Sequence, residues 1–230
     1  MILAAFSLYY MRDNPVACTI LYCISCLLDA FDGVLARRLD QCSKFGAVLD
    51  MVTDRCTTTC LLVFLTLEYP RWALLFQFLV SLDFSSHYIH MYSSLTTGSS
   101  SHKIVGADVS RILWYYYNDS VSIHADQRTL FFFCAGNEAF FVCLYLMAFY
   151  KVPLNISLDV IPGVAAIAAQ NKFVSWVVYR AVPQLTWPQI CAAVTFPVCA
   201  AKQIINCVQF WKAAKTLTGI DLKERHARRT

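Results

Sequence analysis

Four aspartates lie within two neighbouring apolar segments that are each long enough to cross a membrane. The segments cover residues 16–39 and 45–67, and a short polar linker joins them. A spanning helix needs about 20 mainly apolar residues, and a carboxylate at membrane depth costs about 2.5–3.5 kcal/mol on insertion scales. Because four such carboxylates would together cost roughly 10–14 kcal/mol, we expect a cationic group to lie between the two helices.

The composition indicates a polytopic helical membrane protein. Apolar residues make up 58% of the 230 residues and charged residues only 15%, which is too apolar for an ordinary soluble domain. We expect an all-α bundle of about six transmembrane helices that forms a single domain over residues 1–230. The net charge is +4, and a basic tail is expected at residues 218–230. The sequence lacks the interleaved aromatic and basic residues that are typical of single-strand nucleic-acid binders, so we expect no nucleic-acid partner.

The remaining apolar segments complete the bundle. Full spans are expected at residues 72–91, 129–150 and 188–217, and the polar residues 93–128 are expected to form a loop with some helix. Residues 1–11 are apolar but would reach only about 16 Å as a helix, about half of the hydrocarbon core. We therefore expect the first transmembrane helix to be truncated.

The basic residues predict the topology. If the linker at residues 37–44 is cytosolic, most of the lysines and arginines, including those of the tail, fall on the cytosolic side. This holds only if residues 161–179 do not cross the membrane. That segment is apolar but carries Gln170, Asn171 and Lys172 at its centre, so we expect it to be re-entrant or to lie on the membrane surface.

The spacing of the four aspartates defines a candidate metal site. Asp29 and Asp32 are three residues apart, and Asp50 and Asp54 are four apart, so each pair projects from one face of a helix. Carboxylates without a histidine or thiolate in register favour Mg²⁺ or Mn²⁺ over zinc or iron. Two pairs on adjacent helices could hold two ions roughly 3.5–4 Å apart, an arrangement used in phosphoryl chemistry.

Residues beside the aspartates indicate a phosphate-containing substrate. Gly33 costs about 1 kcal/mol relative to alanine inside a helix, which is reasonable if a substrate approaches the backbone there. Arg37 lies one turn further along the same face, and its guanidinium suits a phosphate. Gly46, four residues before Asp50, would let two helices pack closely.

Two other classes of protein place acids inside a membrane. A transporter or cation channel would not need Gly33 and Arg37 in register with the aspartates. An intramembrane prenyltransferase also binds Mg²⁺ through aspartate-rich helices, but its two motifs are typically far apart in sequence. Here only a tight linker separates Asp32 from Asp50.

The pattern resembles the signature of the CDP-alcohol phosphatidyltransferase family, D-x-x-D-G-x-x-A-R-x8-G-x-x-x-D-x-x-x-D. Every position from Asp29 to Asp54 matches, including Ala36. The flanking residues in LLDAFDG, FGAVLDMVTDRC and FCAGNE are most similar to the family members that accept inositol. The signature alone leaves glycerol phosphate, serine, choline and ethanolamine open as acceptors.

The resemblance implies transfer of a phosphatidyl group from CDP-diacylglycerol to myo-inositol, with release of CMP. It implies that Asp29, Asp32, Asp50 and Asp54 hold Mg²⁺ or Mn²⁺, and that Asp54 takes the proton from the attacking hydroxyl. It further implies a homodimer in the endoplasmic reticulum membrane, with the active site and the C-terminal tail in the cytosol.

The resemblance also assigns the neighbouring residues. Gly33, Arg37 and Ser43 are expected to contact CDP-diacylglycerol, while Ala36 and Gly46 serve helix packing.

Three polar residues in or near the later spans, Asn137, Glu138 and Lys202, could line an inositol pocket. Related enzymes carry an upstream interfacial helix, so we expect this chain to bind the lipid substrate poorly.

Overall fold

The structure is a computed structural model that describes residues 2–97, 128–158, 161 and 163–229. Every regular element in these ranges is a helix, so the predicted all-α class is confirmed. The longer helices are α1 (Ile2–Tyr9), α2 (Pro15–Arg38), α3 (Lys44–Glu68), α4 (Ala73–Thr96), α6 (Arg128–Phe149), α7 (Val164–Gln170), α8 (Lys172–Trp176) and α9 (Trp187–Ala227). Short turns of 3₁₀ or π-helix lie at Pro70–Trp72, Val177–Ala181 and Val182–Gln184.

Local sequence explains where the two aspartate-bearing helices begin and end. Asn14 caps α2 by accepting a backbone hydrogen bond, and Pro15 occupies the first turn, where its missing N–H is not needed. Beyond the end of α2, Asp40 adopts a left-handed backbone with φ of 53°, which aspartate tolerates better than most residues. Ser43 then caps α3, because its Oγ accepts a hydrogen bond from the Gly46 N–H at 2.9 Å. The two helices are therefore joined by a tight, well-defined linker.

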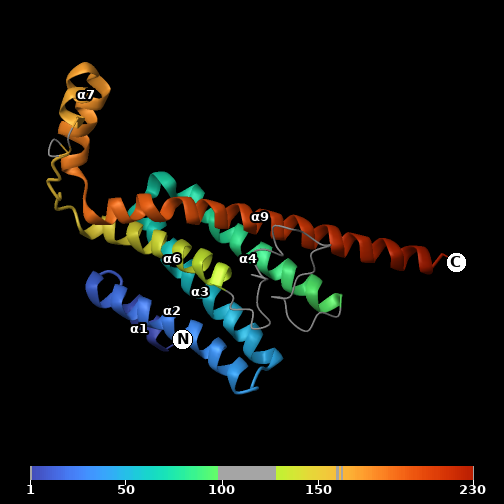
Figure 1. Ribbon diagram of the computed structural model, residues 1–230. Helices are drawn as coiled ribbons and strands as arrows, with labels where there is room; N and C mark the ends of the chain where they lie inside the picture. The colour runs from blue at the N-terminus through green and yellow to red at the C-terminus, as the bar shows by residue number, and fades with distance from the viewer. Residues whose placement is uncertain (1, 98–127, 159–160, 162, 230) are drawn as a thin grey trace.

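The bundle is built around α9, which packs mainly against α6 and α4 and runs along the whole molecule in Figure 1. Helix α3 packs against α4 and α6, whereas α2 packs against α1 and makes a smaller contact with α6. The apolar core brings together side chains from α2, α3 and α6, including Tyr22, Leu61, Leu65, Phe141 and Tyr145. One face of α3, from Met51 to Leu65, is thus buried, while α2 lies at the edge of the bundle.

Three helices are each long and apolar enough to cross a membrane: α2, the Thr129–Phe149 part of α6, and α9. Helices α3 and α4 meet this criterion only when taken together, and their axes are bent by 120° at the break between them. The presence of several long apolar helices identifies the fold as that of a helical membrane protein. The assignment of α3 and α4 as two separate spans stays a prediction.

The segment around residues 161–179 does not form one long helix. It is divided into α7, α8 and the turn Val177–Ala181, with Asn171 capping α8, and in Figure 1 it projects from the bundle near the start of α9. The expectation that the segment is re-entrant or lies on the membrane surface stays a prediction. Most of the predicted loop at residues 93–128 lies outside the described residues.

Helix α9 is longer than the span predicted at residues 188–217. It continues to Ala227, so the first part of the basic tail is helical and extends beyond the other helices in Figure 1.

Among the described glycines, Gly136 allows the closest approach of two helices. A Cβ added there would come 2.5 Å from Cγ1 of Val198, so α6 and α9 could not keep their separation with a larger residue. Sequence reasoning did not single out this glycine. Its place in an apolar run with many bulky residues was the available signal.

We predict that Gly136→Ala lowers the free energy of unfolding by about 1–3 kcal/mol, as overpacking of a tight contact does. Thermal denaturation of the protein in detergent would measure this. The matched control is Gly219→Ala in α9, because no described atom lies within 4 Å of a Cβ at that position. The control should be neutral or slightly stabilising, and Val198→Ala should partly rescue Gly136→Ala. Equal melting temperatures for the two glycine variants would contradict the close approach.

Candidate active site

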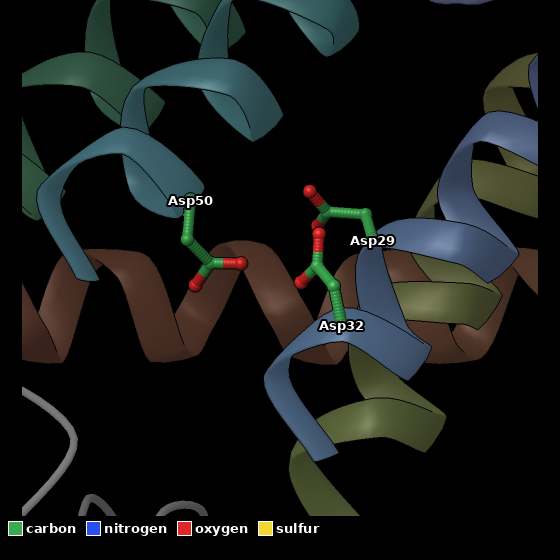
Figure 2. Close-up of side chains that lie close together, drawn as sticks. All are labelled: Asp29, Asp32 and Asp50. Carbon is green, nitrogen blue, oxygen red and sulfur yellow. The ribbon is translucent and has the colours of Figure 1, made fainter. Parts of the chain in front are cut away.

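Asp29 and Asp32 of α2 face Asp50 of α3 across the gap between the two helices (Figure 2). One carboxylate oxygen from each residue lies within 4.8 Å of the other two. Asp29 and Asp50 are half-buried, and Asp32 is exposed. The tight linker brings the two helices together so that acids separated by about twenty residues of sequence share one site.

This group of oxygen atoms fits a divalent cation. Three carboxylates held this close repel one another unless a positive charge lies between them. Carboxylate oxygen is the ligand type that Mg²⁺ and Mn²⁺ prefer. The chemistry of the donor set therefore supports the metal site expected from the sequence.

Asp54, the fourth predicted acid, lies beside the three-carboxylate group. It is half-buried and lies one turn after Asp50 on α3. Its carboxylate also lies 3.5 Å from Nη2 of Arg55. Asp54 is thus placed between the carboxylate cluster and a buried cation, and its role as a ligand stays a prediction.

The predicted substrate-contacting residues flank this group. A Cβ on Gly33 would lie 3.5 Å from Nη1 of Arg37, so the exposed Arg37 side chain reaches back over the glycine, next to Asp32. Ser43 caps α3 through its hydroxyl. Their contacts with a substrate stay predictions.

The structure corrects the reason given for Gly46. A Cβ there would come 3.0 Å from Oγ of Ser43 in the cap of the same helix, and no other described side chain or neighbouring helix lies within 4 Å. Close helix–helix packing is seen at Gly136 instead. Ala36 is half-buried, and its packing role stays a prediction.

Glu138 of α6 connects three helices behind the aspartates. One of its carboxylate oxygens accepts a hydrogen bond from Tyr22 of α2 at 2.6 Å, and the other accepts one from Thr58 of α3 at 2.8 Å. A carboxylate that accepts bonds from two other helices fixes their relative position. Glu138 therefore holds α2 and α3, which carry the aspartates, against α6.

Asn137 and Lys202 belong to a neighbouring part of the same polar network. Asn137 accepts a hydrogen bond from Gln203 at 2.9 Å, and Lys202 donates one to Asn206 at 2.9 Å. Asn206 also lies 3.3 Å from Oε1 of Gln203. The three residues predicted to line an inositol pocket thus lie close to one another, but each already contacts protein groups.

Sequence reasoning missed a buried ion pair beside Asp54. Arg55 of α3 donates to Asp83 of α4 at 2.6 Å, and the two residues are only 9% and 8% exposed. The sequence analysis gave no role to Arg55 or Asp83. The available signal was the presence of opposite charges in two neighbouring apolar segments, where each is costly without the other.

Comparison with known proteins agrees with this geometry. Residues 1–111 match the family described as CDP-alcohol phosphatidyltransferase. The CDP-diacylglycerol–inositol 3-phosphatidyltransferase of Schizosaccharomyces pombe is 45% identical over 226 residues, which cover 98% of this chain and 87% of that protein. The enzyme of the same name from Rattus norvegicus is 37% identical over 224 residues, covering 97% and 89%.

A third relative of the same name, from Saccharomyces cerevisiae, is 49% identical over 148 residues, covering 64% of each chain. The chain belongs to the CDP-alcohol phosphatidyltransferase family. Members of this family generally depend on a divalent metal ion. No solved structure matches the chain.

We predict that Asp29→Asn and Asp32→Asn each weaken metal binding, because each removes one charged oxygen ligand from the group. Titration of the purified protein with Mn²⁺ would measure this, and excess Mn²⁺ should partly restore activity. Asp40→Asn is the matched control, since this exposed acid of the linker is outside the carboxylate cluster. If Asp29→Asn and Asp40→Asn bind Mn²⁺ equally well, Asp29 is not a ligand.

Proposed function

We propose that this protein transfers the phosphatidyl group of CDP-diacylglycerol to myo-inositol, forming phosphatidylinositol and CMP. The observation that carries the proposal is the carboxylate group of Asp29, Asp32 and Asp50, which lies within a complete family signature. The named activity of relatives that align with nearly the whole chain supports inositol as the acceptor.

The aspartates supply a site for the diphosphate of the lipid. Asp29, Asp32 and Asp50, together with Asp54, would hold one or two Mg²⁺ or Mn²⁺ ions. When bound, these ions would neutralise the charge of the diphosphate and of the departing CMP. Arg37 is positioned to bind a phosphate oxygen through its guanidinium, and Gly33 leaves room for the substrate to approach the helix.

Asp54 is suited to accept a proton. A hydroxyl oxygen of inositol attacks the phosphorus that carries the diacylglycerol, the bond from this phosphorus to CMP breaks, and Asp54 takes the hydroxyl proton. A general base must lie within hydrogen-bonding reach of that proton. Asp54 lies beside the three-carboxylate group that would hold the diphosphate, which supports this role.

The exposed face of α2 suits a substrate with two acyl chains. Leu28, Phe31 and Leu35 are between 52% and 62% exposed and alternate along the helix with the two aspartates. In a bilayer these side chains would face lipid, so the diacylglycerol part could remain in the membrane while its diphosphate reaches the site.

We also propose the cellular setting that the family resemblance implies. The chain would be a single multi-pass domain in the endoplasmic reticulum membrane, with the active site and the C-terminal tail in the cytosol, and it would form a homodimer. Basic residues lie at the end of α2 (Arg37 and Arg38), at the start of α3 (Lys44) and in the tail, and they support this topology.

We predict that membranes containing the protein, given CDP-diacylglycerol and Mg²⁺ or Mn²⁺, consume inositol and release CMP. Competition among inositol, glycerol 3-phosphate, serine and choline, with lipid products identified by mass spectrometry, tests the acceptor directly. Phosphatidylinositol should be the dominant product. Another phospholipid as main product would preserve the family assignment and overturn inositol as the acceptor.

We further predict that Asp54→Asn reduces turnover by roughly 10²–10⁴-fold, as loss of a general base does, while binding of CDP-diacylglycerol is largely retained. The fold should persist because the ion pair of Arg55 with Asp83 does not require Asp54. Turnover numbers and lipid-binding affinities of purified protein would measure the two effects. Unchanged turnover in Asp54→Asn would exclude Asp54 as the base.

A further inference from the structure

A buried polar cluster extends from Asp54 into the bundle between α3, α4 and α9. Arg55 lies 3.5 Å from Asp54 and 2.6 Å from Asp83. Asn206 of α9 donates to the same oxygen of Asp83 at 3.4 Å. Gln209 follows Asn206 by three residues and therefore lies on the same face of α9, one turn further along. The cluster thus connects the proposed base with the centre of the α4–α9 contact.

Several atoms of this cluster have no hydrogen-bond partner among the described residues. They are Nε of Arg55, Oδ2 of Asp83, and both Oε1 and Nε2 of Gln209. Gln209 is 0% exposed, so its amide lies entirely inside the protein. Because leaving a buried polar group without a partner destabilises a protein, these atoms are expected to meet a polar molecule that the fold admits.

The donors and acceptors among these four atoms are best matched by hydroxyl groups of a ligand. Nε of Arg55 and Nε2 of Gln209 donate, whereas Oδ2 of Asp83 and Oε1 of Gln209 accept, and a hydroxyl can do both. The positive charge of Arg55 is already compensated by Asp83 and Asp54. Lys202, the other buried cation beside Asp83, already donates to Asn206. A neutral polyol therefore fits this cluster better than a phosphorylated or zwitterionic alcohol.

We propose that Arg55, Asp83 and Gln209 bind the non-reacting hydroxyl groups of the acceptor polyol. This inference rests on the proposed function, because it places the acceptor on the side of Asp54 that faces α4 and α9. The hydroxyl that attacks lies at Asp54, and the remaining hydroxyls meet Nε of Arg55, Oδ2 of Asp83 and the amide of Gln209. Gln209 is then a residue that determines the specificity for the acceptor.

The test is Gln209→Met, which keeps the length of the side chain but removes both amide atoms. The KM for inositol should rise by about tenfold or more, because hydrogen bonds to the acceptor are lost. The KM for CDP-diacylglycerol should stay unchanged. Inositol should raise the melting temperature of the parent protein but not that of Gln209→Met. Without inositol the variant should be as stable as the parent or more so, since an apolar side chain replaces an amide without partners.

The matched control is Gln189→Met at the start of the same helix. The amide oxygen of Gln189 accepts a hydrogen bond from the Thr186 N–H at 2.9 Å and forms part of a capping box. Its loss should lower thermal stability through the lost cap and leave the KM for inositol unchanged.

Each outcome separates the inference from the proposed function. If the parent forms phosphatidylinositol but Gln209→Met keeps the parent's KM for inositol, this inference is overturned and the proposed function survives. If Gln209→Met loses as much stability as Gln189→Met, its amide has a structural role and the inference is again overturned. A parent protein that forms no phosphatidylinositol overturns both.

Discussion

The structure depends on how buried charges are compensated inside an apolar bundle. Arg55 is held by Asp83, and Glu138 accepts hydrogen bonds from Tyr22 and Thr58. Removing Asp83 would leave the buried charge of Arg55 without its partner, which is far more costly than losing a surface ion pair, and removing a hydroxyl donor would leave a buried oxygen of Glu138 without its hydrogen bond. These two contacts tie α3 to α4, α6 and α2, and they therefore decide where the aspartates of α3 lie.

The two halves of the carboxylate cluster have different surroundings. Asp50 and Asp54 belong to α3, which packs against both α4 and α6, whereas Asp29 and Asp32 belong to α2 at the edge of the bundle. Apolar side chains of α2 are exposed beside its acids, and polar side chains lie behind those of α3. This asymmetry suits a reaction between a lipid and a polar alcohol. The lipid could approach the aspartates from the apolar side at α2, and the alcohol from the polar side at α3.

Some of the fold could be predicted because its cause is local. The capped ends of α2 and α3 follow from Asn14, Pro15 and Ser43, and the division of residues 161–179 agrees with the polar residues at the centre of that segment. The reason given for Gly46 was wrong, because a glycine near a helix start can serve a cap as well as a helix crossing. The tight crossing at Gly136 could not be found without knowing which residue of another helix lies opposite.

The sequence by itself determined the all-α membrane class and the candidate metal site. Both depend on short-range regularities: the length of the apolar segments and the spacing of Asp29, Asp32, Asp50 and Asp54 across a tight linker. Only the tertiary structure decided that Arg55 pairs with Asp83, that Glu138 joins three helices, and that the buried amide of Gln209 has no partner among the described residues. These contacts join residues that are distant in the chain, and their positions are set by the packing of whole helices rather than by any local pattern.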